Sequence, residues 1–271
     1  MAKLFCAERI VPAWLAAVRE LERQPGRISQ NFVLEITHPG QIAQSDSNVI
    51  SSVDHKLRQG EDGIGVFTVA GTIFPNRLYK HLGRPAFYER FLTSMKRGKD
   101  RGTWGTYALR MIQRTNRTTG LPFNPLDIIV EKLIKARQGR RIRAAYELGI
   151  FEPADLLNEH DRPDGFELPL YDPITDGGRP TNIPCLSHLS FKLQDNGTVD
   201  LTALYRSHYY VQRALGNLIG LSQLQAFVAR ESGFEQGVLT CVSSQACLDV
   251  GAWGGVSAAR EFINTFPVAD N

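Results

Sequence analysis

The chain has 271 residues, of which 42% are hydrophobic and 22% charged, a composition typical of a globular protein. Its net charge of +3 is mild and does not indicate a nucleic-acid partner. There is no apolar run long enough to span a bilayer and no secretory leader, so we expect a cytoplasmic protein without a membrane partner. The four cysteines lack CxxC spacing, which predicts reduced thiols and no metal site.

Hydrophobic spacing in the first half of the chain predicts three helices, over residues 8–24, 85–98 and 125–137. Apolar runs rich in β-branched residues predict strands over 31–36 and 64–71. The polar stretch between these strands, up to about Gly63, is expected to hold loop and short elements only. No internal repeat or linker is visible, so we expect a single α+β domain over residues 1–271.

The second half is predicted to begin with a strand over 139–148 and a long surface loop over 152–183. A hairpin follows, with arms over 184–193 and 198–208 and a turn at Asp195-Asn196-Gly197. A mostly buried helix over 209–232, a strand over 238–243 and a helix over about 255–265 complete the predicted elements.

The first arm of this hairpin opens on Pro184-Cys185 and then alternates in polarity. The period of two predicts that Leu186, His188, Ser190 and Lys192 face one way, and Ser187, Leu189, Phe191 and Leu193 the other. Cys185 therefore stands at the beginning of a strand, where a cleft can reach it. It can act as a nucleophile if nearby arginines stabilise its thiolate. The alternative, which spacing alone favours, is that Cys185 is a small buried hydrophobe.

Two groups of arginines are candidate phosphate ligands, Arg140-Arg141 and Arg206-Ser207. For the run from Arg137 to Arg143, a solvated basic face or an RNA contact is the alternative. Neighbouring residues of a strand point to opposite faces, so Arg140 and Arg141 need not serve one site in the same way. Asn217 lies within an apolar helix, where its amide either satisfies internal backbone groups or reads a ligand.

In combination these residues resemble the thymidylate synthase family. That family has a Pro-Cys opening a strand, an Arg-Ser ending the next strand, and an Asn in the following helix, here Pro184-Cys185, Arg206-Ser207 and Asn217. The eleven-residue interval from Arg206 to Asn217 matches the family without a gap. Looser matches are the double arginine Arg140-Arg141, the segment Gly105-Thr106-Tyr107, the turn Phe74-Pro75 and the glutamate Glu89. The resemblance covers residues 74–250 and is strongest over 140–217.

The resemblance implies a thymidylate synthase-like fold, with helices packed on a mixed sheet and a homodimer formed through that sheet. It implies that Cys185 adds to C6 of a pyrimidine nucleoside monophosphate, whose C5 then accepts a one-carbon unit from 5,10-methylenetetrahydrofolate. It further implies that Glu89 transfers protons and that Tyr107 lines the pocket beside the thiol. Arg206 and Ser207 would bind the phosphate, and Asn217 would recognise the base. Arg140 and Arg141 would bind the phosphate of the other subunit across the dimer.

Four positions depart from the family pattern. Leu186 stands where the family has His, and Tyr209 where it has an Asp that contacts folate. Cys247 and Asp249 occupy the positions of the His and Tyr that bind the deoxyribose 3′-hydroxyl. A changed sugar site suggests a ribonucleotide, and changed folate-side residues suggest that water rather than hydride completes the reaction.

These departures point to the hydroxymethylase branch of the family, such as the CMP hydroxymethylases of nucleoside-antibiotic pathways. We therefore expect a one-carbon transferase that hydroxymethylates C5 of CMP. Asn217 leaves a uracil base as an alternative to cytosine, because deoxycytidylate hydroxymethylases of the family usually carry Asp at that position. The alternatives are methylation of dUMP, as in thymidylate synthase, and a non-catalytic protein of this fold that binds a nucleotide or RNA.

Overall fold

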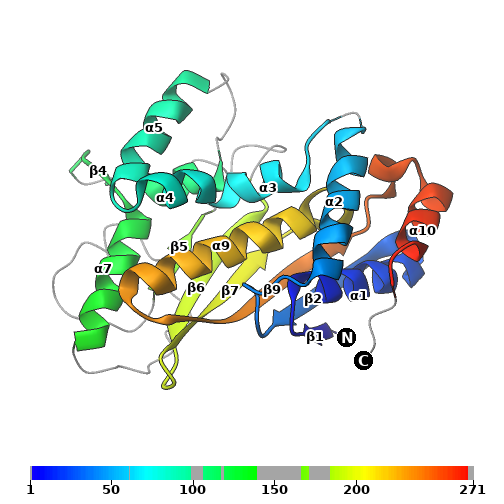
Figure 1. Ribbon diagram of the computed structural model, residues 1–271, viewed down its shortest axis with the longest axis horizontal. Helices are drawn as coiled ribbons and strands as arrows, with labels where there is room; N and C mark the ends of the chain where they lie inside the picture. The colour runs from blue at the N-terminus through cyan, green and yellow to red at the C-terminus, as the bar shows by residue number, and fades with distance from the viewer. Residues whose placement is uncertain are drawn as a thin grey trace.

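The computed structural model of the chain describes residues 2–60, 62–98, 106–116, 119–138, 166–170 and 184–267 (Figure 1). Within these residues, seven strands form one mixed sheet, in the order β1-β2-β9-β7-β6-β5 with β8 paired to β9. The strands are β1 (Lys3–Ala7), β2 (Ile28–Ile36), β5 (Phe166–Pro169), β6 (Leu186–Leu193), β7 (Thr198–Tyr205), β8 (His208–Tyr209) and β9 (Glu235–Cys247). The pairs β1·β2, β7·β9 and β8·β9 are parallel, and the pairs β2·β9, β6·β7 and β5·β6 are antiparallel.

Helices α1 (Ile10–Arg23) and α9 (Leu215–Ser232) pack on one face of this sheet, and α9 runs across its centre (Figure 1). A short π-helical segment, η3 (Tyr210–Ala214), leads from β8 into α9. The other helices are α2 (Gln44–Arg58), α3 (Val66–Ile73), α4 (Asn76–Leu82), α5 (Ala86–Gly98), α6 (Tyr107–Ile112), α7 (Pro125–Gln138) and α10 (Val256–Asn264), with short 3-10 turns η1 (Pro25–Arg27) and η4 (Val250–Trp253) and a small ribbon of β3 (Arg114–Thr115) and β4 (Pro122–Phe123).

The central helix α9 is buried on nearly all sides, as its evenly distributed apolar residues predict. Two glycines one helical turn apart allow α3 to approach it closely. A Cβ on Gly216 would lie 2.6 Å from the Val66 carbonyl oxygen, and one on Gly220 would lie 2.7 Å from that of Ala70. These distances are far inside van der Waals contact, so the α3–α9 packing requires glycine at both positions.

Most predicted elements are confirmed. The helices predicted over 8–24, 85–98 and 125–137 are α1, α5 and α7, and the one over 209–232 is η3 followed by α9. The hairpin is β6 and β7, the strands over 31–36 and 238–243 lie within β2 and β9, and the terminal helix is α10. Phe74-Pro75 connects α3 to α4, and the Phe74 ring packs against Phe227 of α9 with centroids 4.9 Å apart.

Three expectations were wrong, and one strand was not predicted. The strand predicted over 64–71 is the helix α3, whose buried residues are Val66, Val69, Ala70 and Ile73. These four residues follow helical spacing. The helical period could not be recognised within 64–71 alone, because that stretch ends before Ile73. The stretch expected to be loop up to Gly63 contains the 15-residue helix α2. Strand β1 was not predicted, and β5 lies within the loop expected over 152–183. The strand expected over 139–148 falls outside the described residues.

The alternation predicted along β6 also needs correction. The register between β6 and β7 shifts between Leu186 and His188. Because a bulge adds one residue to one strand, it reverses which residues face the core. Leu186 and Leu189 are therefore both fully buried, although they were expected on opposite faces. The bulge lies next to Cys185 and sets the direction in which the strand end points.

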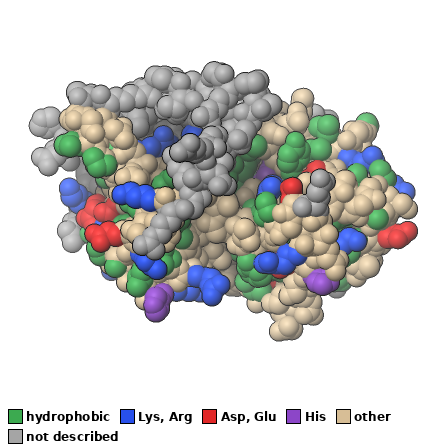
Figure 2. All heavy atoms as spheres, turned by 90° about the horizontal axis from the view of Figure 1, so that it is seen from above, with side chains coloured by type: hydrophobic (Ala, Val, Ile, Leu, Met, Phe, Trp, Pro, Cys, Tyr) green, Lys and Arg blue, Asp and Glu red, His purple; other side chains and the backbone are tan. Residues whose placement is uncertain are grey.

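Three further observations concern the surface charge, the hydropathy of the helices and the cysteines. Seen from above, Lys and Arg side chains are interspersed with acidic and apolar ones over the visible described surface (Figure 2). No helix within the described residues combines the length and the hydropathy needed to cross a membrane. The four cysteines are all free thiols.

Candidate active site

The structure brings Cys185, Tyr107 and Arg206 together at the start of β6. The Tyr107 hydroxyl oxygen accepts the backbone N–H groups of Cys185 at 3.1 Å and of Leu186 at 3.2 Å. The Cys185 carbonyl oxygen accepts the Arg206 backbone N–H at 3.0 Å. Three separate elements therefore fix the backbone that carries the thiol: α6, the start of β6 and the end of β7.

The position of Tyr107 follows from local sequence. Thr106 is the N-cap of α6, and its hydroxyl accepts the Leu109 N–H at 3.2 Å. Tyr107 is thereby the first residue of the helix, and its side chain is buried. Burial raises the pKa of Tyr107 to about 12, so the hydroxyl stays protonated at neutral pH.

Two guanidinium groups oppose the effect of burial on the Cys185 thiol. Cys185 is half-buried, and burial raises the pKa of the thiol, while the charges of Arg206 and Arg213 lower it. Sequence reasoning identified Arg206 but missed Arg213. A sequence feature that could have revealed it is that Arg213 is the single charged residue between Arg206 and Arg230 in an otherwise apolar stretch.

Arg213 lies in η3 and faces two carboxylates as well as the thiol. Its guanidinium is 3.8 Å from a carboxylate oxygen of Asp62. The Asp249 carboxylate accepts the N–H groups of Val211 at 2.8 Å and Gln212 at 3.2 Å. Burial raises the pKa of Asp249, and these hydrogen bonds and the Arg213 charge oppose the rise. Asp249 thus anchors the beginning of η3, and the sugar-binding role expected for it stays a prediction.

Asn217 belongs to a buried polar network behind the thiol. Its amide nitrogen lies 3.0 Å from Nε2 of His208, whose Nδ1 lies 3.1 Å from Ser243 Oγ. Burial lowers the pKa of His208 to about 3, so its imidazole is neutral. The His208 ring stacks on Tyr205 with centroids 3.9 Å apart. One end of the Asn217 amide is therefore engaged inside the protein, and the base contact predicted for Asn217 stays a prediction.

The other predicted site residues are not linked to Cys185 by the contacts described above. Glu89 is exposed on α5, with no contact to Cys185 recorded in the described part of the chain. Ser207 is half-buried between β7 and β8. Cys247 ends β9, and burial and the Asp249 charge raise the pKa of its thiol, whereas Arg27 lowers it. Arg140 and Arg141 lie outside the described residues, so their predicted phosphate contacts remain predictions.

A cavity of about 870 Å³ adjoins Arg213 and is large enough for a nucleotide. Two of its lining residues adjoin Arg213, because Asp62 lies 3.8 Å from its guanidinium and Gln212 precedes it in the chain, and a third, Asp249, accepts the Gln212 N–H. Its polar wall mixes both charge signs and includes Arg27, Lys56, Asp62 and Asp249. Arg27 has a left-handed φ of 57°, an uncommon conformation for a residue with a side chain.

Comparisons with known proteins agree with this architecture. No protein-family model matches the chain. Proteins of Methanosarcina mazei and Methanosarcina acetivorans, provisionally named thymidylate synthases, are each 39% identical over 82 residues, which is 30% of this chain and 37% of theirs. A protein of Methanococcoides burtonii with the same name is 41% identical over 64 residues, 24% of this chain and 29% of its own length. The matches thus span little more than a third of these relatives.

The thermostable thymidylate synthase A of Bacillus subtilis superposes with a TM-score of 0.50 at 10% identity, over 93% of this chain and 84% of that one. The chain therefore has the thymidylate synthase fold, which confirms the predicted α+β class with a mixed sheet. Together, the partial relatives and this structural neighbour support a relationship to the thymidylate synthase family.

Proposed function

We propose that the chain transfers a one-carbon unit from 5,10-methylenetetrahydrofolate to C5 of a pyrimidine nucleotide, and that the reaction is hydroxymethylation of CMP. The observation that carries the proposal is the arrangement around Cys185. Its backbone is fixed by the Tyr107 hydroxyl, and its thiol lies within the field of Arg206 and Arg213. A nucleophilic cysteine needs both a defined direction and cationic neighbours, and this cysteine has both.

The thiolate of Cys185 attacks C6 of the pyrimidine ring. As the sulfur–C6 bond forms, the electron pair of the C5–C6 double bond moves onto C5 and is delocalised toward the substituent at C4. Burial raises the pKa of the Cys185 thiol, and Arg206 and Arg213 oppose that rise, since their positive charges favour the ionised form. Tyr107 keeps the strand end in place, because its oxygen holds two successive backbone N–H groups.

Arg206 and Ser207 are suited to bind the phosphate of the nucleotide. A guanidinium offers paired donors to phosphate oxygens, and a neighbouring hydroxyl adds a third. In this proposal Arg140 and Arg141 of a second copy complete the phosphate site. Dimerisation through the sheet is supported by β7, whose buried residues alternate with outward-facing ones such as Leu204, which is 37% exposed. Leu204 pairs with Val242 of β9, so two apolar side chains are adjacent on that face.

The folate supplies the one-carbon unit when it is bound. The described residues fit such a group at Tyr209, which is 48% exposed and follows Arg206 by three positions. Its ring offers a flat surface on which a pterin could stack. Tyr209 replaces the acidic residue that the family carries there, and this change on the folate side is compatible with water rather than hydride completing the reaction at C5. Hydroxymethylation requires that water.

Asn217 is proposed to read the base. One end of its amide contacts Nε2 of His208, which is a donor or an acceptor according to the tautomer of the imidazole. An amide can present a donor or an acceptor according to its rotation, which is compatible with cytosine and with uracil. The alternative within the same chemistry is thymidylate synthase-type methylation of dUMP.

Product analysis separates these reactions. Purified protein is incubated with methylenetetrahydrofolate and one of CMP, dCMP, UMP or dUMP, and the product mass is measured. The proposal predicts that CMP gains CH₂O and that no dihydrofolate is formed. Gain of a methyl group on dUMP, with dihydrofolate formation, would establish the alternative.

A second candidate function is nucleotide or RNA binding without turnover. Two observations favour it: burial raises the pKa of the Cys185 thiol, and one end of the Asn217 amide is engaged with His208. This candidate predicts binding of a pyrimidine nucleotide, measured by equilibrium dialysis, with no product from any of the four substrates. Formation of product that requires Cys185 would eliminate it.

A further inference from the structure

A second cavity, of about 310 Å³, lies on the outer side of α9 and is walled by α4, the segment 39–42 and the N-terminal parts of α1 and α2. Its volume is at the lower end of the range for small-molecule sites. On α9 it begins at Ile219, two residues after Asn217. Two residues correspond to a rotation of about 200° on a helix, so this cavity opens on the side opposite the candidate active site.

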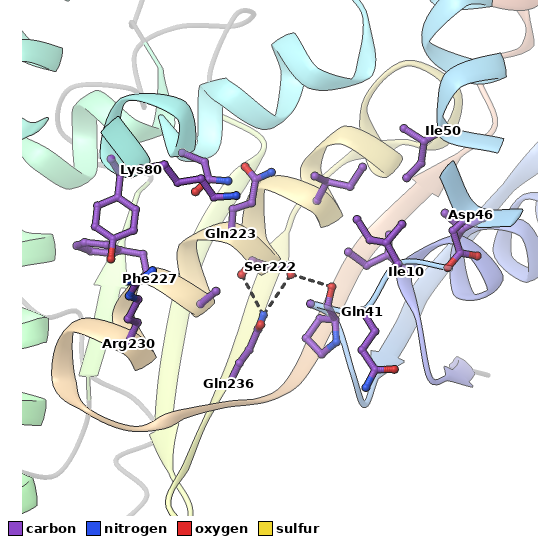
Figure 3. Close-up of a pocket in the computed structure, with 18 residues that line it drawn as sticks. Ile10, Gln41, Asp46, Ile50, Lys80, Ser222, Gln223, Phe227, Arg230 and Gln236 are labelled. Atoms are coloured by element: carbon purple, nitrogen blue, oxygen red, sulfur yellow. Dashed lines mark hydrogen bonds between the residues drawn. The ribbon is translucent and has the colours of Figure 1, made fainter. Parts of the chain in front are cut away.

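One end of the cavity is cationic. Figure 3 shows Lys80 and Arg230 at this end, and Asp46 and Ile50 at the other. Both cations are exposed, and neither makes an ion pair within the described residues. The nearby carboxylate of Glu231 accepts a hydrogen bond from the Tyr79 hydroxyl. The charge balance at this end therefore remains positive.

The acidic residue at the opposite end is already neutralised. The Asp46 carboxylate is 2.7 Å from Nε of Arg9 and accepts the Ala43 backbone N–H at 2.9 Å. It lies 5% exposed, so it contributes a structural contact between α1 and α2 rather than a site for a cation. A ligand in the cavity thus meets positive charge at one end and no free negative charge at the other.

The middle of the cavity carries carboxamide groups in two different states. Gln236 is held by the protein, since its amide nitrogen donates to the Ser222 carbonyl oxygen at 3.0 Å. By contrast, the side chains of Gln223, Gln41 and Asn76 make no hydrogen bond in the part of the chain that the structure describes. Gln223 and Asn76 are half-buried, and a half-buried amide without a hydrogen bond is stabilised when a ligand supplies one. Each offers both a donor and an acceptor, as the polar edge of a heterocyclic base requires.

We propose that this cavity is a second binding site for a nucleoside monophosphate. Lys80 and Arg230 hold the phosphate, because Arg and Lys are the side chains that best complement phosphate oxygens. The carboxamides of Gln223 and its neighbours contact the base edge, and the apolar side chains of Ile42 and Ile219 pack against the ring. The site is independent of Cys185, so it does not rest on the chemistry proposed for the thiol.

Equilibrium dialysis of the full chain with radiolabelled UMP and, separately, CMP tests this proposal. With the candidate active site intact, we expect two nucleotides bound per chain. Lys80→Ala combined with Arg230→Ala should weaken one of these sites at least about tenfold, since each lost charge-assisted contact is worth about that factor. Ala226→Trp should close the same site by filling the cavity, without removing a charge.

Two controls make the result decisive. Arg90→Ala removes an exposed cation from α5, outside the cavity, and should leave both sites unchanged. Arg206→Ala should weaken only the site beside Cys185. If the site beside Cys185 binds no nucleotide, wild type binds one nucleotide that survives Arg206→Ala and is lost in Ala226→Trp, so failure at that site is distinguishable from failure of the cavity proposal. Unchanged binding in folded Lys80→Ala/Arg230→Ala and Ala226→Trp variants would overturn the cavity proposal.

Discussion

Removing the hydroxyl group from either of two buried tyrosines near the Cys185 thiol is predicted to change the free energy of unfolding in opposite directions. In Tyr107→Phe, the backbone N–H groups of Cys185 and Leu186 lose their acceptor. An unsatisfied buried donor costs about 1–3 kcal/mol. Leu186 is fully buried and Cys185 half-buried, so we expect a total loss of about 2–4 kcal/mol in the free energy of unfolding.

Tyr205→Phe is the matched control. Tyr205 is completely buried, and its hydroxyl has no hydrogen-bond partner among the described residues. Removing it eliminates a desolvated polar group, so the free energy of unfolding should stay constant or rise by up to about 1 kcal/mol. Urea denaturation followed by tryptophan fluorescence measures both variants. If Tyr107→Phe costs no more than Tyr205→Phe, the hydroxyl does not hold the thiol's backbone and the reasoning fails.

Three further predictions concern charge, pH and packing. Arg213→Ala removes a cation that lowers the pKa of the Cys185 thiol, so iodoacetamide should alkylate Cys185 more slowly at pH 8 than in wild type; an equal or faster rate would exclude this influence. Burial lowers the pKa of His208 from 6.5 to about 3, so the stability it supports is complete above pH 6.5 and is lost as pH falls toward 3. His208→Gln should flatten that part of the curve of urea midpoint against pH, and an unchanged slope would contradict the assignment. Gly220→Ala should destabilise the protein by about 1–3 kcal/mol through overpacking against α3. Gly71→Ala, where nothing lies within 4 Å, should stabilise it slightly, and thermal melts that rank the two in the opposite order would refute the packing argument.

The sequence predicts the parts of the fold in which one periodicity dominates. The hairpin β6–β7 was predicted from its alternation and its Asp195-Asn196-Gly197 turn, and α1 from its single apolar face. Helix α3 was mistaken for a strand because a short apolar run fits either period until its full length is known. Helix α2 was missed because its polar composition concealed a narrow buried stripe.

The same limits apply to the candidate site. Cys185 and Arg206 could be singled out from their positions on a predicted hairpin, and Tyr107 from the family resemblance; the structure places the three together, while their roles stay predictions. Arg213 could not be predicted in this way, since its influence on the thiol depends on the tertiary position of η3. The bulge between Leu186 and His188 is equally invisible to a pattern of strict alternation. The pairing of Asn217 with His208 depends on the path of the chain between β8 and α9.

Release of tritium from a pyrimidine nucleotide labelled at C5 tests the central claim most directly, because it requires the thiol to add at C6. With methylenetetrahydrofolate present, the wild-type protein should release tritium from labelled CMP, and Cys185→Ala should release none. Cys6→Ala, which removes an exposed thiol in β1, should retain release and serves as the control for cysteine loss. Full release by Cys185→Ala, or no release by wild type from labelled CMP, dCMP, UMP or dUMP, would contradict the proposed mechanism.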